Sequence, residues 1–326
     1  MTLDSDTQIE ARALTRLTER IARSIDAGEY DGAVVAIAHR GEIVAHEAIG
    51  YAERDTDRPA RRDDVFRILS ITKAFTTNLV FQAIEQGKLS FSTKVVEVIP
   101  EFRSADRFLN KRKDRISVTD LLTHRSALPP TPEPLPTHEL GSLSRVIERV
   151  CEMDAIGEPG KAIEYSPLFN HALLGEMVRR VQGAESYRQL AQRDIFDPLG
   201  MTNTAIGAAK RLQSRLVPLR ARFEATGWLS ASDIESLNTT LDEQAEMPWV
   251  GAVSTAGDLL RFAEMLRRGG ELNGVRLVSP AILDRATRNL TARSPHRARS
   301  ATTAPARHFS GWTPSANSAS WCSPRV

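Results

Sequence analysis

Ser70 and Lys73 are the residues of this 326-residue chain whose types and spacing suit nucleophilic chemistry. Residues three apart on a helix share one face, so the Lys73 amine can reach the Ser70 hydroxyl and take its proton. The first turn of a helix also carries backbone amides without partners, which would polarise the group that Ser70 attacks. The pair therefore predicts a serine nucleophile with its own base. The alternative is a serine at a helix start followed by a solvated lysine.

A tyrosine on a loop is the second chemical candidate. Pro159-Gly160 predicts a turn, and residues 163–167 follow as a short extended stretch before a helical run at 172–178. A tyrosine on such a loop can enter a cleft and pass protons beside a lysine cation. Tyr165 is this residue, and the alternative is an ordinary half-buried tyrosine.

The surrounding sequence predicts the elements that would hold these groups. Apolar residues at helical spacing follow Lys73 and end near Gly87, as glycine commonly ends a helix. Two apolar strands, at 33–38 and 43–49, are expected to pair as a hairpin. Helices are expected over 9–27, through much of 64–201, and over 255–268 and 281–289, whereas 204–248 is polar, weakly periodic and given no element.

Composition and charge indicate a soluble enzyme. With 41% hydrophobic and 26% charged residues, the chain can bury a large core as one large domain or two. A net charge of +2 gives no case for nucleic-acid binding, and no apolar run approaches the roughly 18 residues of a membrane span. The first residues lack the basic and apolar parts of a signal peptide, so a cytoplasmic location is expected.

No metal or cofactor is expected. Cys151 and Cys322 lie far apart, with no second cysteine near either, so neither a zinc site nor a disulfide framework is indicated. The sequence also lacks a phosphate-binding loop, a His-Glu-x-x-His pair and a Gly-x-Ser-x-Gly elbow.

Residues 291–326 differ in composition from the rest of the chain. They contain five arginines but no Asp, Glu, Lys, Leu or Ile, and they show neither strand alternation nor a helical stripe. This composition predicts a disordered tail that supplies no strands.

Several segments together resemble the serine β-lactamase-like superfamily, which includes class C β-lactamases, D-alanyl-D-alanine peptidases and family VIII carboxylesterases. The similar segments occur in the family's order at 65–73, 85–89, 116–124, 196–201 and 251–260. Within them, Ser117 with Asp120 and Thr255 with Asp258 are spaced as helix-capping boxes. His124 is interpreted as a structural hydrogen-bonding residue, outside the mechanism.

The resemblance implies an α+β fold, in which an antiparallel sheet flanked by helices holds an inserted all-helical domain. Residues 1–62 and 250–290 would form the sheet-and-helix domain, and 63–249 the mainly helical domain. In the family, the chain after the last helix supplies further strands next to the first hairpin. Because 291–326 reads as an aberrant or truncated C-terminus, the sheet is expected to be incomplete.

By the same resemblance, Ser70 is the nucleophile, Lys73 accepts or relays its proton, and Tyr165 acts as base on acylation and as acid towards the leaving group. The Ser70 amide would form half of the oxyanion hole. Which of Lys73 and Tyr165 holds the decisive proton stays open.

Two family motifs depart from their usual form. The site motif of the C-terminal strand has its nearest candidate in His308 and Gly311, whose neighbours do not read as a strand. The family's Tyr-x-Asn is broken by Pro167, and Asn170 comes three residues too late to take the same place. That asparagine usually contacts the amide of a β-lactam or peptide, so its loss favours esters. Asn170, His308 and Gly311 are nevertheless kept as candidate substrate-binding residues.

The sequence therefore predicts a serine hydrolase that cleaves carboxylic esters, acting on a small-molecule ester or amide without nucleic acid or membrane. Two alternatives stay open. One is a β-lactamase or D-alanyl-D-alanine peptidase of the same fold. The other is an impaired or non-catalytic remnant, because the C-terminus is defective.

Overall fold

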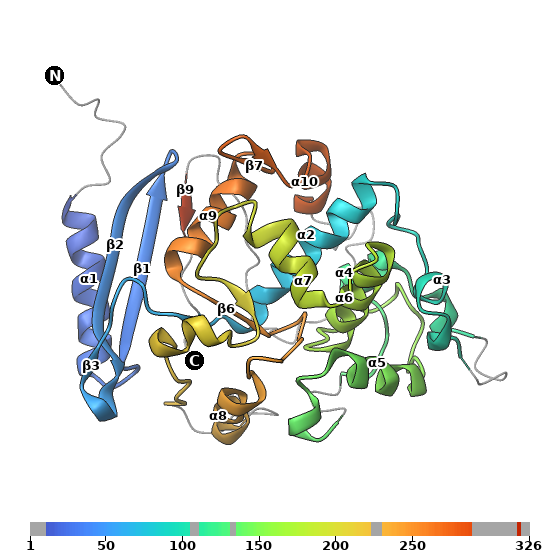
Figure 1. Cartoon of the computed structure of the whole chain (residues 1–326), viewed down its shortest axis with the longest axis horizontal. Helices are drawn as coiled ribbons and strands as arrows, with labels where there is room; N and C mark the ends of the chain where they lie inside the picture. The colour runs from blue at the N-terminus through green and yellow to red at the C-terminus, as the bar shows by residue number, and fades with distance from the viewer. Residues whose placement is uncertain (1–10, 105–110, 131–134, 223–229, 289–317, 321–326) are drawn as a thin grey trace, which may run out of the picture.

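The computed structural model describes residues 11–104, 111–130, 135–222, 230–288 and 318–320 (Figure 1). Its helices are α1 (Ala11–Asp26), α2 (Thr72–Glu85), α3 (Val95–Val98), α4 (Val118–Leu122), α5 (Leu143–Glu152), α6 (Phe169–Val181), α7 (Tyr187–Ala191), α8 (Ala231–Thr240), α9 (Ala256–Arg267) and α10 (Pro280–Thr287). Its strands are β1 (Gly32–His39), β2 (Glu42–Glu53), β3 (Arg58–Pro59), β4 (Phe66–Arg67), β5 (Ala205–Ile206), β6 (Ala252–Ser254), β7 (Glu271–Leu272), β8 (Val275–Arg276) and β9 (Ser318–Ser320).

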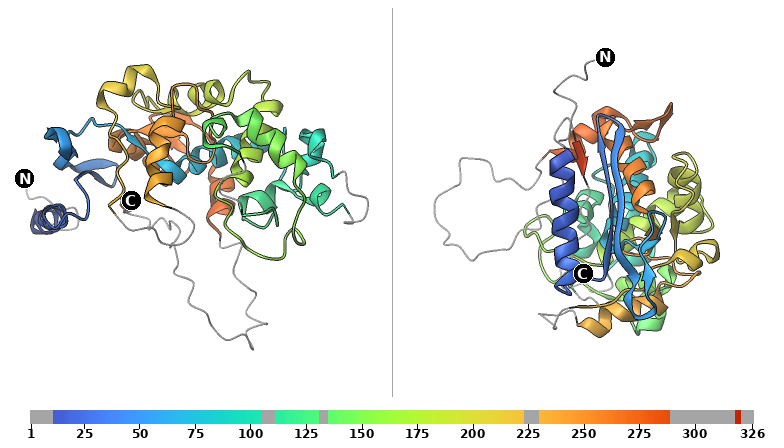
Figure 2. Two further views of the ribbon diagram at one scale, coloured as in Figure 1. Left: turned by 90° about the horizontal axis from the view of Figure 1, so that it is seen from below. Right: turned by 90° about the vertical axis from the view of Figure 1, so that its left-hand side faces the viewer.

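The N-terminal hairpin forms the centre of the larger sheet, whose strand order is β3-β2-β1-β9. β1 and β2 pair antiparallel from Gly32 opposite Gly50 to His39 opposite Glu42, with an irregularity between Ile37 and Ala38. α1 packs on one face of this hairpin and α9 packs against β1 from the other side (Figure 2). The predicted hairpin is confirmed, and its strands are longer than expected.

The C-terminal segment contributes one strand, contrary to the expectation from its composition. β9 pairs antiparallel with the end of β1, Ser318 opposite His39 and Ser320 opposite Ile37. Strand pairing uses backbone groups, so a short Ser-Ala-Ser strand needs no apolar alternation to form, which is why composition did not reveal it. The rest of the expected tail lies outside the described residues.

The largest apolar cluster among the described residues surrounds α2. Phe75, fully buried on α2, meets the rings of Phe196 and Phe262 edge-on, with centroids 5.1 and 4.8 Å apart. Phe262 belongs to α9, so this cluster includes residues from both sides of the predicted boundary at 249/250. The division into two domains stays a prediction.

A second, three-stranded sheet links distant segments next to α2. Its order is β4-β6-β5, with Phe66 opposite Ser254 and Ala205 opposite Val253. This pairing brings the segment before Ser70 alongside the segment after Trp249. The region 204–248, which the sequence left without elements, contains β5, a 3-10 helix at Lys210–Arg215 and α8.

Of the two expected capping boxes, the one at α4 is complete and the one at α9 is only half formed. Ser117 and Asp120 cap α4 reciprocally, each accepting from the other's backbone amide. Thr255 caps α9 by accepting from the Asp258 amide, but Asp258 Oδ2 accepts instead from the Asn203 amide and the Thr204 hydroxyl. Asp258 therefore connects α9 to the turn before β5. In the described parts of the chain, no helix is long and apolar enough to cross a membrane.

Candidate active site

Ser70 lies at a sharp turn immediately before α2. The sequence predicted it within the first turn of that helix, whereas it occupies a 3-10 turn, Leu69–Ile71, and α2 begins at Thr72. The preceding Leu69 has φ +45, a left-handed conformation that costs a bulky residue on the order of 1–2 kcal/mol. This turn leaves Ser70 exposed at the beginning of α2.

Lys73 lies one turn further along and is almost completely buried, with 8% of its surface exposed. Its Nζ donates to Ser70 Oγ at 3.1 Å and to the carbonyl oxygen of Trp249 at 3.0 Å. Because the amine is held from two sides, it is fixed beside the Ser70 hydroxyl.

Two threonines attach α2 to the segment that carries the Trp249 carbonyl. Thr76 Oγ1 donates to the carbonyl oxygen of Pro248 at 2.6 Å, and Thr72 Oγ1 accepts from the Ala252 amide at 3.0 Å. Gly251 allows the close turn there, since a Cβ at that position would lie 2.8 Å from the Met247 carbonyl oxygen. The sequence reasoning did not find the Trp249 carbonyl, because a backbone acceptor leaves no mark on residue type.

Burial changes the acid–base chemistry of Lys73. Removal from water lowers the pKa of its ammonium from 10.5 to about 7. A substantial fraction of the amine is then neutral at neutral pH and able to accept a proton.

Tyr165 reaches the same oxygen from the loop before α6. Its Oη lies 3.1 Å from Ser70 Oγ, and Lys73 Nζ lies 5.5 Å from the centroid of its ring. The side chain is 50% exposed, so the phenol lies at the surface of the site and not beneath it. The structure therefore brings Ser70, Lys73 and Tyr165 together around Ser70 Oγ.

Asn170 does not line this site, in contrast to its predicted contact with substrate. It is fully buried on α6, where its Oδ1 accepts from Ser126 Oγ at 2.8 Å and its Nδ2 donates to the Leu121 carbonyl at 3.2 Å. An amide that is buried and hydrogen-bonded at both ends supports the neighbouring loop and is not available to a substrate. The other two predicted contact residues, His308 and Gly311, lie outside the described residues.

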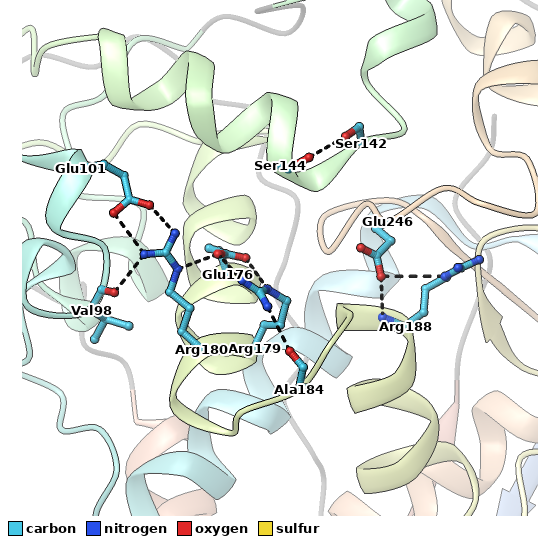
Figure 3. A network of polar contacts seen from close by, with 10 residues as sticks. All are labelled: Val98, Glu101, Ser142, Ser144, Glu176, Arg179, Arg180, Ala184, Arg188 and Glu246. Carbon is cyan, nitrogen blue, oxygen red and sulfur yellow. Dashed lines mark hydrogen bonds and ion pairs between the residues drawn. The ribbon is translucent and has the colours of Figure 1, made fainter.

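An ion-pair network fixes α6, the helix that follows the Tyr165 loop (Figure 3). Glu176 accepts from Arg179 and Arg180, and Arg180 also pairs with Glu101 beside α3. Burial would raise the pKa of Glu176, but the hydrogen bonds from these two arginines hold it below its usual value. The carboxylate therefore stays ionised and helps keep α6 in place.

A cavity of about 990 Å³ borders that network. Its lining includes Glu176, Arg179, Glu246 and the first turn of α5, but none of the three side chains that meet around Ser70 Oγ. Ser70 Oγ thus lies outside this cavity. In the part of the chain that the structure describes, no group of three His, Cys, Asp or Glu side chains is arranged to hold a metal ion.

Comparisons with known proteins bear on the family and the fold. The family model described as Beta-lactamase matches residues 17–320, a range that reaches into the C-terminal segment with aberrant composition. An uncharacterised protein of Mycobacterium tuberculosis is 28% identical over 287 residues, covering 78% of this chain and 67% of that protein. Esterase EstB of Burkholderia gladioli is 36% identical over 97 residues, which are 30% of this chain and 24% of EstB.

Among solved structures, EstCE1, described as a hydrolase with promiscuous acyltransferase activity, superposes with a TM-score of 0.70 at 25% identity. The superposition covers 83% of this chain and 76% of EstCE1. Penicillin-binding proteins and an amidase are also among the similar proteins. The fold is thus α+β and β-lactamase-like, as predicted, and the comparisons leave the substrate class open.

Proposed function

Because this chain belongs to the beta-lactamase family, we propose that it is a serine hydrolase that cleaves carboxylic esters through a covalent acyl-enzyme on Ser70. The family match confirms the resemblance in its motifs and makes the chain a hydrolase of the beta-lactamase superfamily. The observation that carries the proposal is the approach of Lys73 Nζ and Tyr165 Oη to Ser70 Oγ, each at 3.1 Å.

Acylation begins with removal of the Ser70 proton. The neutral amine of Lys73 accepts it directly, or Tyr165 accepts it while Lys73 as ammonium stabilises the phenolate. Ser70 Oγ then bonds to the ester carbonyl carbon, and the Ser70 amide stabilises the oxyanion. As the carbon–oxygen bond to the alcohol breaks, Tyr165 donates a proton to the departing oxygen. Its exposed position at the mouth of the site suits this exchange with the leaving group. Where Lys73 took the Ser70 proton, it passes that proton on to Tyr165, which restores both groups.

Deacylation repeats these steps with water in place of the alcohol. A water molecule gives a proton to the Lys73 and Tyr165 pair and its oxygen attacks the acyl carbon. The proton returns to Ser70 Oγ as the acid leaves, which restores the starting enzyme.

The preference for esters rests on the residues after Tyr165. Pro167 stands where the family commonly has asparagine, and the neighbouring Asn170 is buried and hydrogen-bonded within the protein. A β-lactam or peptide amide would miss that side-chain partner, whereas an ester offers no N–H that needs one. The 36% identity to an esterase over part of the chain supports the same choice.

Parallel assays with p-nitrophenyl butyrate and nitrocefin test this function. We expect turnover of the ester that Ser70→Ala abolishes, and little hydrolysis of nitrocefin. Nitrocefin turnover above that of the ester would overturn the substrate class. Ester turnover that is unchanged in Ser70→Ala would overturn the mechanism.

A further inference from the structure

We propose that His124 is a positioning residue that holds the Tyr165 phenol in line with Ser70, an inference that rests on the proposed role of Tyr165. The His124 carbonyl oxygen accepts from the Glu164 amide at 2.8 Å, and its Nδ1 accepts from the Ser166 amide at 3.1 Å. One residue thus binds the backbone on both sides of Tyr165.

The imidazole ring also contacts the tyrosine directly. The ring centroids of His124 and Tyr165 are 4.8 Å apart, with planes tilted by 40°. Because Tyr165 is 50% exposed, much of its ring has no protein packed on it. The orientation of the phenol therefore depends strongly on the few contacts that it does make, and His124 supplies both backbone and ring contacts.

The backbone of His124 is suited to this double contact. Its φ is +54, a left-handed conformation in which Asn, Asp and His occur more often than other side chains. The next residue holds the turn in place, since the Arg125 amide donates to the Asp120 carbonyl at 2.7 Å and the Arg125 carbonyl accepts from Gly160 at 2.8 Å. The turn at Gly160 and the loop that carries Tyr165 are thereby connected to the end of α4.

The bond from Ser166 requires an unprotonated Nδ1, which assigns the neutral tautomer with its hydrogen on Nε2. Burial, and secondarily the Lys73 cation, lower the pKa of His124 to about 4. The titratable groups that face it are Lys73 from α2, Tyr165 from its loop and His171 from α6, whose ring lies 5.8 Å away. His124 therefore keeps its acceptor throughout the neutral range, and burial lowers the pKa of the neighbouring His171 as well.

Two substitutions distinguish the effect of the Nδ1 acceptor of His124 from the effect of its backbone conformation. Asparagine and glycine both tolerate a positive φ, but only asparagine offers an acceptor near the place of Nδ1. We expect His124→Gly to lower kcat by a factor on the order of 100, because small displacements of a reacting group cost about that much. We expect His124→Asn to recover most of that loss. A kcat for His124→Asn as low as that for His124→Gly would overturn the role of the acceptor.

Repeating His124→Gly in a Tyr165→Phe background decides whether His124 acts through the phenol. If it does, the substitution costs kcat little once the phenol hydroxyl is gone. An equal loss in both backgrounds would show a general structural role and overturn the proposal, while the proposed function would stand. A Tyr165→Phe enzyme with wild-type kcat would instead overturn the proposed role of Tyr165, and the positioning role with it.

Discussion

The region around α2 and the region around the N-terminal hairpin are packed very differently. α2 lies within the large apolar cluster. It carries Lys73, which is itself buried. In β1 and β2 the buried residues are three alanines, Ala36, Ala38 and Ala52. A groove of about 440 Å³, lined by Leu17, Val35, Ile37 and Ile49 among others, remains between α1 and these strands.

Buried polar atoms without a hydrogen-bond partner occur in both regions. Buried Nε2 atoms of His39 and His46, both in the hairpin, have no hydrogen-bond partner. Around the site, Lys73 Nζ, Thr72 Oγ1 and Thr76 Oγ1 all have partners. Asn78 Nδ2 on α2 and His171 Nδ1 on α6 do not. The two regions therefore differ in apolar packing and not in unpaired polar groups, and the packing difference indicates that the hairpin region limits the stability of the sheet.

The largest effect expected within the well-packed region is on proton transfer. Lys73→Met and Tyr165→Phe should each lower kcat by a factor on the order of 100 or more, because each removes a proton carrier next to Ser70 Oγ. If the two act as one unit, the double variant should lose much less than the product of the single losses. Steady-state kinetics of the four proteins measures this, and multiplicative losses would show that the residues are not coupled.

A pair of core substitutions tests the packing contrast itself. Phe75→Ala, at a fully buried position on α2, should lower the free energy of unfolding by about 3–5 kcal/mol. Ile37→Ala, at a half-buried position in β1, should cost about 1–2 kcal/mol, since fewer contacts are lost. Urea unfolding measures both. Equal losses, or a larger one for Ile37→Ala, would contradict the account of the two regions.

Burial of the Lys73 charge should lower the free energy of unfolding at low pH. Below pH 7 the amine is protonated in both the folded and the unfolded chain, so the folded protein bears the full cost of a buried charge. Between about pH 7 and 10.5 the folded chain binds fewer protons than the unfolded one, so stability rises with pH. Lys73→Met should therefore be more stable than the wild type at pH 6, by about 1–4 kcal/mol.

Thermal unfolding of the wild type and of Lys73→Met across this pH range measures the difference in their stability. It should shrink as the pH approaches 10, and a Lys73→Met variant that is less stable than the wild type at pH 6 would count against a buried ammonium. The double variant with Tyr165→Phe serves as a control, because Tyr165 is half exposed and its hydroxyl should add little to this difference.

The same titration should appear in catalysis. If neutral Lys73 takes the Ser70 proton, kcat/KM should rise about tenfold per unit of pH below 7 and level off above it. Initial rates with p-nitrophenyl butyrate from pH 5.5 to 8.5, corrected for spontaneous hydrolysis, give this profile. A kcat/KM that falls as the pH rises through 7 would mean that the protonated amine is the active form.

The features that the sequence predicted correctly depend on local patterns. The hairpin, the helix after Lys73 and the turn at Gly160 follow from apolar spacing and from glycine, which short windows reveal. The meeting of Tyr165 with Ser70 was expected from the family resemblance, because nothing local relates residues 95 positions apart.

The features that the sequence missed depend on backbone groups and long-range contacts. The Trp249 carbonyl beside Lys73 and the pairing of β9 with β1 involve atoms that every residue has. The burial of Asn170 was missed because it depends on contacts with Ser126 and Leu121, more than 40 positions away, which residue type does not reveal. His124 was correctly interpreted as a hydrogen-bonding residue, but its two bonds around Tyr165 became visible only in the fold.

Covalent labelling of Ser70 tests the central claim most directly. The wild type and Ser70→Ala would each be treated with a fluorophosphonate, digested and examined by mass spectrometry, with Lys73→Met as a variant that keeps the serine but lacks its base. The account predicts a single adduct on Ser70 in the wild type, much slower labelling in Lys73→Met, and none in Ser70→Ala. An adduct on another serine, or equal labelling of Ser70→Ala, would contradict it.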